Sequence, residues 1–323
     1  MSAVDGAALI ALLGIVLYAI LGGADFGGGL WELLASGPRR EQQRTVITEA
    51  IGPVWEANHV WLIFVIVTLF TCFPAAFSDI ATGDNTPLAI ALLGIVLRGS
   101  AYAFRNYADD DKVAHFWLVV FGSASIITPF FLGTAVGGIA TGSYAWHSPF
   151  ALCVGLLAVA LCGELAAVFL LLETADPLLR QDFRRRAIIA TIAVWILGIP
   201  PASLARAEYP PLFAALTSPI ALGAIGAAII IGIGVMSCVA AHAYVAARVA
   251  VGAEVLAVLL GWFGAQAPAL VPGHLTFQAA ASPDATLVAF LIAAAIGAVF
   301  LIPSLYCLFA VFKSRPRALS QRQ

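Results

Sequence analysis

Three polar residues lie together in an otherwise mostly apolar stretch, residues 51–62. They are Glu56, Asn58 and His59, and the run 63–70, which is apolar except for Thr68, follows directly. An ionisable side chain inside a bilayer costs about 2.5 kcal/mol or more on insertion scales, so by default it marks a function. The stretch is therefore the first candidate site of the chain.

The same stretch also has a structural interpretation. If it lies at the surface of the membrane, Glu56 and His59 face water and need no function. Trp55 and Trp61 then belong to the aromatic belt that membrane helices place at the interface. Position alone leaves both interpretations open.

The composition predicts an integral membrane protein. Of the 323 residues, 62% are hydrophobic and 11% are charged, and the mean hydropathy is +0.98. A soluble domain has about a quarter of its residues charged. The net charge of −2, without a basic face, gives no indication of nucleic-acid binding. The first apolar run begins at Ala7 with no Lys or Arg before it, so we expect a retained first helix and not a cleaved signal peptide.

The apolar runs predict nine membrane spans, because about 20 apolar residues are needed to cross a bilayer. The expected spans are Ala7–Leu34, Val60–Phe77, Pro87–Phe104, Val113–Ala140, Pro149–Leu172, Ala187–Ala205, Ser218–Ala241, Ala243–Gly264 and Ala285–Phe312. The seventh and eighth are the least clearly separated, since only His242, Tyr244 and Arg248 interrupt the long apolar stretch there.

The distribution of basic residues tests this count, because cytoplasmic loops of membrane proteins are rich in Lys and Arg. With the N-terminus outside, fifteen of the sixteen basic residues fall on the cytoplasmic side and only Arg206 falls outside. This bias predicts an odd number of spans and a cytoplasmic C-terminus. The loops on the outer side are short, so we expect no sizeable domain outside the membrane.

Small residues indicate where helices approach one another closely. Gly23 and Gly27 form a small-xxx-small pair in the first span, a spacing that favours close packing of membrane helices. In the seventh span, packing glycines are expected at four positions: Gly223, Gly226, Gly232 and Gly234.

The predicted topology brings polar residues of three consecutive spans into one half of the membrane. Asp25 lies toward the cytoplasmic end of the first span, and Glu56 and His59 lie at the cytoplasmic start of the second. Arg98 lies about two turns from the cytoplasmic end of the third. Such an array suits either a proton relay or a structural ion pair that fixes the helix register. Glu164, His242 and Glu254 are more isolated in the sequence.

The chain shows no motif for hydrolysis or for a metal site. It lacks Gly-x-Ser-x-Gly, a Walker loop and His-Glu-x-x-His, and its five cysteines have no paired spacing. None of the five histidines has a partner at helical spacing, so a bis-histidine haem is not indicated.

Three segments resemble the signatures of subunit II of cytochrome bd-type quinol oxidases. The segment 22–29, Gly-Gly-Ala-Asp-Phe-Gly-Gly-Gly, is similar to the Asp-Gly-Phe-Asp-x-Gly signature of that family. The segments 51–61 and 97–105 are similar to its second and third signatures, and a C-terminal pattern matches at 281–306. The matches run through the whole chain in the right order.

The chain departs from the family pattern at three positions. Gly22 stands where the first signature usually has an acid, so the first span lacks one of two carboxylates. Glu56 stands where many members have Asp, and His59 where many have Glu or Gln.

The resemblance implies a fold and a function. The fold is all-α, with two four-helix bundles and one peripheral helix, and we assign residues 1–140, 141–270 and 271–323 to these parts. The implied complex oxidises quinol and reduces O2 to water in the cytoplasmic membrane of a bacterium or archaeon. Subunit I, the implied partner, carries the b- and d-type haems, and small accessory subunits can join the complex. Subunit II ordinarily binds no haem or metal, supports assembly, and can hold a quinone or lipid.

The resemblance also gives roles to the converging polar residues. We expect Glu56 and Asp25 to line a cytoplasmic proton pathway, supported by His59 and Arg98. Two alternatives are a secondary transporter, which favours broken helices and inverted repeats, and a purely structural membrane scaffold.

Overall fold

The protein is almost entirely helical in its computed structural model, which describes residues 2–105, 107 and 110–313; the side chains of residues 51–57, 59 and 308–313 lie outside this description. The elements are α1 (Ala3–Leu33), α2 (Arg40–Cys72), α3 (Pro74–Gly83), α4 (Asn85–Arg105), α5 (Asp111–Thr141), α6 (Pro149–Leu170), α7 (Pro177–Glu208), α8 (Pro210–Leu216), α9 (Pro219–Ala240), α10 (Tyr244–Gln266), β1 (Ala269–Val271), β2 (Leu275–Thr276), α11 (Phe277–Ala280) and α12 (Asp284–Lys313).

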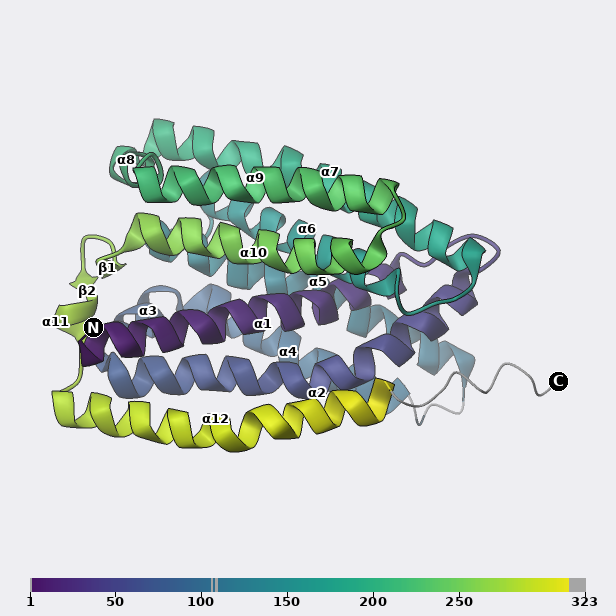
Figure 1. The fold of residues 1–323 in the computed structure, drawn as a ribbon, viewed down its shortest axis with the longest axis horizontal. Coiled ribbons are helices and arrows are strands. Elements are labelled where there is room, and N and C mark those ends of the chain that lie inside the picture. Colours follow the sequence, from purple (N-terminus) through teal and green to yellow (C-terminus); the bar gives the residue numbers. More distant parts are fainter. Residues whose placement is uncertain (1, 106, 108–109, 314–323) are drawn as a thin grey trace.

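The long helices lie side by side in one layered bundle (Figure 1). α1, α2, α4 and α5 pack together, α6, α7, α9 and α10 pack together, and α1 and α5 join the two groups through α6. α12 packs along the outside, against α2 and α1. The short elements α3, α8, α11 and the β1–β2 hairpin lie at the end of the bundle where α1 begins.

Several helices begin at residues that supply the backbone N–H groups of a first turn with an acceptor. Ser2 and Asp5 form a capping box at the start of α1. Ser148, Asp176 and Ser218 each accept from the turn that follows and each precede a proline, which needs no hydrogen bond at the first helical position.

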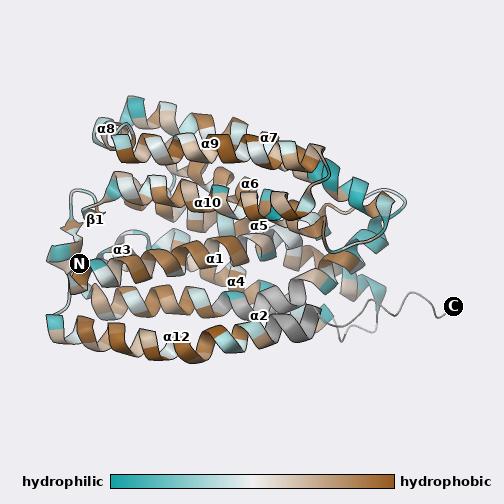
Figure 2. Ribbon diagram, viewed as in Figure 1, coloured by the Kyte–Doolittle hydropathy of each residue, from teal (hydrophilic) through white to brown (hydrophobic). Residues whose placement is uncertain are grey.

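The surface along the middle of the bundle is apolar. Figure 2 shows brown, hydrophobic residues along the helices and teal, hydrophilic ones mainly at the two ends of the bundle. In the described part of the chain, eight helices are long and apolar enough to cross a membrane, or nine if one bent pair counts as a single span. The all-α membrane fold is therefore confirmed, as is the break between the seventh and eighth predicted spans, at residues 241–243.

The second predicted span, Val60–Phe77, covers the apolar end of a longer helix and the bend that follows it. Helix α2 begins at Arg40, twenty residues before the predicted start, because its charged first half continues the same helix. It ends at Cys72, and the chain then bends by 118° into α3. Pro74 explains the bend, since proline lacks an N–H and disfavours helical geometry at the preceding residue, Phe73.

Glycine packing within the chain is confirmed in α1 and, in α9, at Gly232. A Cβ on Gly27 would overlap the backbone carbonyl of Cys162, so α1 and α6 approach closely at this point. By contrast, a Cβ on Gly223, Gly226 or Gly234 would meet nothing within 4 Å. These three glycines lie on a face of α9 that no described helix of this chain covers, so packing at these positions stays a prediction.

Candidate functional site

A fully buried ion pair joins α1 to α4. The Arg98 guanidinium donates to both carboxylate oxygens of Asp25, at 2.6 Å from Nη1 and 2.5 Å from Nη2. Nη2 also donates to the Asp25 carbonyl oxygen at 3.0 Å. Both residues are about 1% exposed. A bidentate pair of this kind fixes both the distance and the orientation of the two side chains.

Arg98 is held on its other sides by α5 and by two aromatic rings. Its Nε donates to the Ser125 hydroxyl at 2.8 Å, and this hydroxyl donates to the Phe121 carbonyl oxygen. The guanidinium carbon lies 4.5 Å from the ring centre of Phe121 and 5.0 Å from that of Phe26. Cations are attracted to aromatic faces at such distances, so the rings offset part of the cost of burying the charge.

Asn58 brings the signature stretch of α2 to the same carboxylate. Its amide nitrogen lies 3.5 Å from Oδ2 of Asp25, and its side chain is fully buried. A Cβ on Gly22 would lie 2.8 Å from the Asn58 amide oxygen. The missing acid at position 22 is thus explained sterically, because the Asn58 amide occupies the space next to it.

A second ion pair repeats the first one two turns further along both helices. Arg105 donates to Oε1 of Glu32 at 2.6 Å, and Thr48 of α2 donates to the same oxygen at 3.2 Å. Glu32 follows Asp25 by seven residues, and Arg105 follows Arg98 by seven residues. Because α1 and α4 run in the same direction, equal steps of seven residues bring Glu32 opposite Arg105 just as Asp25 lies opposite Arg98. Together they lock the register of α1 against α4.

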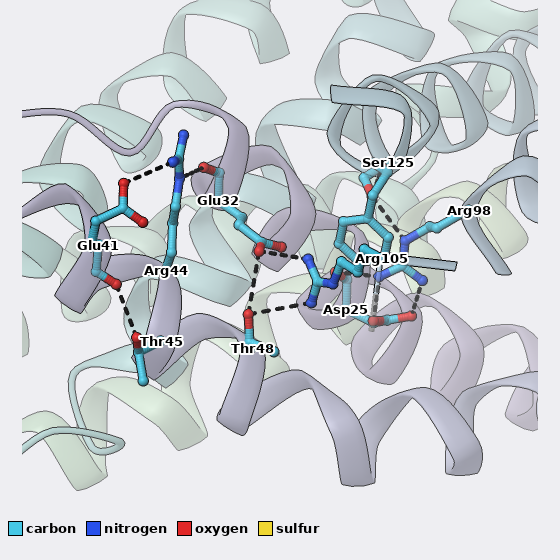
Figure 3. A network of polar contacts seen from close by, with 10 residues as sticks. Asp25, Glu32, Glu41, Arg44, Thr45, Thr48, Arg98, Arg105 and Ser125 are labelled. Atoms are coloured by element: carbon cyan, nitrogen blue, oxygen red, sulfur yellow. Dashed lines mark hydrogen bonds and ion pairs between the residues drawn. The ribbon is translucent and has the colours of Figure 1, made fainter. Parts of the chain in front are cut away.

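The polar network continues to the surface at this end of the bundle. Figure 3 shows Asp25, Arg98 and Ser125 at one side of the network, then Glu32, Arg105 and Thr48, then Arg44 and Glu41. Arg44 lies 3.1 Å from Glu41, whose side chain is 67% exposed. The series therefore runs from a fully buried pair to a solvated one.

A neighbouring cluster ties α1 and α2 to α7. Arg186 donates to the Gln43 amide oxygen and to the Trp31 carbonyl oxygen, while Arg39 forms a bidentate pair with Asp182. These contacts lie at the same end of the bundle as the exposed part of the network.

A small cavity reaches Asp25 from the second group of helices. Its volume is about 40 Å³, and its lining includes Asp25, Gly28, Glu173 and Arg248. A water molecule needs about 10–15 Å³ of such space together with polar partners. The cavity is therefore large and polar enough to hold water beside the buried pair.

Of the four predicted site residues, two can be placed and two cannot. Asp25 and Arg98, 73 residues apart in the sequence, are brought into direct contact. The side chains of Glu56 and His59 lie outside the described residues. Glu32 and Arg105 were missed, although the repeated seven-residue spacing was a signal in the sequence.

A separate polar group lies at the opposite end of the bundle. The Tyr144 hydroxyl donates to Asp79 at 2.7 Å, and Nδ1 of His274 lies 3.1 Å from the same Asp79 oxygen. Next to them, Asp84 joins α3 to α4 and is fully buried, and neither of its carboxylate oxygens has a hydrogen-bond partner among the described residues. Burial raises the pKa of Asp84 to about 7.

Asp84 is expected to make stability depend on pH. Between about pH 4 and about pH 7 the folded chain keeps a proton that the unfolded chain releases. The free energy of unfolding therefore falls as pH rises through this range, by up to ~1.4 kcal/mol per pH unit. Asp84→Asn should remove this decline and be more stable than the wild type at pH 8, as measured by thermal unfolding in detergent. Asp284→Asn, at an exposed acid, is the control and should keep the wild-type slope.

Comparison with known proteins identifies the family. The sequence profile described as "Cytochrome bd terminal oxidase subunit II" matches residues 6–312. The chain belongs to this family. Its fold agrees with that of a bd oxidase subunit: the solved bd oxidase from Geobacillus thermodenitrificans has a chain that superimposes with a TM-score of 0.82 at 20% identity, over 97% of this chain and 99% of that one.

Curated subunit II relatives match over shorter stretches. "Cytochrome bd ubiquinol oxidase subunit 2" of Bacillus subtilis (strain 168) is 36% identical over 125 residues, which are 39% of this chain and 36% of that protein. "Cytochrome bd-I ubiquinol oxidase subunit 2" of Escherichia coli (strain K12) is 22% identical over 209 residues, 58% of this chain and 55% of that protein. The aligned part of this subunit II chain thus spans between about a third and a half of these relatives.

Proposed function

We propose that the chain is subunit II of a membrane-bound quinol oxidase, and that its complex oxidises two quinols for each O2 reduced to two waters. The observation that carries the proposal is the family match over residues 6–312. The family's description names a terminal oxidase, and the relatives from B. subtilis and E. coli are described as ubiquinol oxidase subunits. The membrane is the cytoplasmic membrane in this proposal.

The haems of such a complex are assigned to the partner, subunit I. Haem iron inside a helical bundle needs an axial ligand that reaches its interior. The four histidines whose side chains are described, His115, His147, His242 and His274, are exposed near the ends of helices or in loops. These four positions do not fit a haem within this bundle. A quinone, lipids and small accessory subunits remain further proposed partners.

The proposed role of this chain in catalysis is to line a proton pathway. Reduction of O2 consumes protons, and water beside a carboxylate gives a proton one step of a route toward the site of reduction. The cavity of about 40 Å³ next to Asp25 supports such a route, because Glu173 and Arg248 line it from another helix group. Glu56 is the proposed titratable group at the cytoplasmic start of the route, with His59 beside it.

The pathway has this direction only if the arginine-rich end of the bundle is cytoplasmic. Arg39, Arg40, Arg44, Arg180 and Arg184 lie around the α1–α2 and α6–α7 connections, at the end opposite to the start of α1. Basic loops of membrane proteins are retained in the cytoplasm. On this basis the N-terminus, at the opposite end of the bundle, is expected outside.

Topology reporters should confirm this orientation. A reporter fused after Gln323 is expected in the cytoplasm, while reporters inserted near Gly83 and Pro272 are expected outside. Labelling of intact cells with a membrane-impermeant reagent shows which of the three reporters are outside. Cytoplasmic labelling at both inserted positions would reverse the orientation and with it the direction of the pathway.

The proposed function is tested on the intact complex. The full chain carrying an affinity tag is purified from membranes in mild detergent, and the preparation is assayed for a haem spectrum and for quinol-dependent O2 consumption. Co-purification of a haem-bearing chain with O2 consumption supports the proposal. A pure preparation without haem and without oxidase activity would contradict it and would favour the transporter or scaffold alternatives.

The Glu56→Gln variant tests the proton pathway. The amide keeps the size and hydrogen bonding of the side chain but cannot carry a titrating proton. The complex should assemble with normal haem content and turn over O2 more slowly, by roughly tenfold or more. Glu49→Gln, at an exposed acid of the same helix, is the matched control and should retain full activity. Full activity in both variants would remove Glu56 from the pathway.

A further inference from the structure

The second group of helices buries two carboxylates. Glu164 of α6 and Glu254 of α10 are 0% and 3% exposed. They are 90 residues apart in the sequence, on two helices that contact one another in the folded chain. They lie in the other helix group from the Asp25–Arg98 pair, and the proton pathway proposed above does not use them.

All four helices of this group build the surroundings of the pair. From α7, the Thr191 hydroxyl donates to Oε1 of Glu164 at 2.6 Å. From α9, Gly232 leaves room for the Glu254 side chain, since a Cβ there would lie 2.6 Å from its Oε1 and 3.0 Å from the Trp195 indole nitrogen. The pair is therefore enclosed in a site that the fold shapes around it.

One oxygen of each carboxylate has no hydrogen-bond partner in the described part of the chain. These atoms are Oε2 of Glu164 and Oε2 of Glu254. Two ionised carboxylates inside a bilayer repel one another, and an unpaired buried charge is costly. Something positive must therefore accompany the pair.

The buried and half-buried arginines of the surrounding helices do not supply that positive charge, because they have other partners. Arg98 and Arg105 bind Asp25 and Glu32 of α1, Arg186 of α7 binds Gln43, and Arg248 of α10 lies 3.5 Å from Glu173. α9 has only the titratable thiol of Cys238, and α5 carries no charged residue between 116 and 141.

A metal ion fits this site poorly. Ca²⁺ takes six to eight oxygen ligands and Mg²⁺ takes six. Among the described residues no group of three or more His, Cys, Asp or Glu is placed to hold a metal ion. The Thr191 hydroxyl lies within hydrogen-bond distance of both Oε1 of Glu164 and the Ala187 carbonyl oxygen, and an indole N–H is a donor only.

We propose that Glu164 and Glu254 form a proton-binding site, a carboxylic acid pair that holds at least one proton at neutral pH. A proton on one carboxyl gives the pair the hydrogen-bond donor that its two unpaired oxygens lack, and it lowers the buried charge at once. The site binds protons within the second helix group, apart from the ion-pair network at α1 and α4.

Infrared difference spectroscopy of the purified full-length chain, with the chains that accompany it, tests the proposal. A protonated carboxyl has a carbonyl stretch that an ionised carboxylate lacks, and this band shifts in D2O. The wild type should show such a band at pH 7, and the double variant Glu164→Gln, Glu254→Gln should lose it. Glu208→Gln, at an exposed acid on α7, is the matched control and should keep it. A wild-type spectrum without any component that the double variant removes overturns the proposal.

Two further measurements keep the test decisive. Thr191→Val removes the hydroxyl donor without changing the size of the side chain, and it should shift the frequency of the band without abolishing it. Thermal stability is then compared with and without added Na⁺ or Ca²⁺. Stability that rises with either cation in the wild type, but not in the double variant, shows a metal ion at the site and contradicts a proton pair.

Discussion

The Arg98→Met variant is expected to lose about 3–5 kcal/mol of unfolding free energy, because it leaves the Asp25 carboxylate buried without its partner. Three hydrogen bonds join the guanidinium to Asp25, and a fourth joins it to Ser125. A loss of this size is a large part of the stability of a typical domain. Titration with sodium dodecyl sulfate in mixed micelles measures the change.

A double-mutant cycle separates the pair from its surroundings. Asp25→Asn combined with Arg98→Met removes both charges, and its cost should be well below the sum of the two single costs. Arg40→Met is the control, since Arg40 is 62% exposed and pairs only with the exposed Glu41 among the described residues. A single-variant cost below ~1 kcal/mol, equal to that of the control, would show that the pair does not hold α1 against α4.

Much of the fold could be predicted from the sequence because lipid imposes one simple requirement. A span must be long and apolar, so runs such as 149–172 and 218–241 delimit α6 and α9 to within two residues. Charged residues do not end a helix, however, and the sequence therefore did not reveal that α2 begins at Arg40. The bend after Cys72 could not be predicted either, because apolar residues continue on both sides of Pro74 and the run looks uninterrupted.

The sequence could predict contacts in the candidate site only where the order and direction of the spans are enough to show which residues lie at the same depth. Asp25 and Arg98 belong to spans that run in the same direction, so their depths in the membrane could be compared. The Glu164–Glu254 pair depends instead on how α6 and α10 are rotated about their axes, which side-chain packing determines. The glycines show the same limit: composition marks Gly27 and Gly226 alike, yet only Gly27 faces another helix.

The contact at Gly27 leads to the second large effect, because α1 packs there against α6 of the other helix group. A Cβ at this position would overlap the Cys162 carbonyl and lie 2.7 Å from the Cβ of Ala166. A backbone carbonyl in a helix cannot rotate away as a flexible side chain can, so α1 and α6 must separate. The separation would also disturb the hydrogen bond from the Trp31 indole to the Gly163 carbonyl, at 2.7 Å. We therefore expect Gly27→Ala to cost ~3 kcal/mol or more, at or above the upper end of ordinary overpacking.

The fraction of a tagged full-length chain that stays monodisperse after heating measures this cost. Gly252→Ala in α10 is the matched control, because a Cβ there meets nothing within 4 Å. Alanine favours a helix over glycine, so the control should be unchanged or slightly more heat-resistant. A Gly27→Ala chain as heat-resistant as this control would show that α1 and α6 can move apart freely. The close approach of the two helix groups would then contribute little to holding the subunit together.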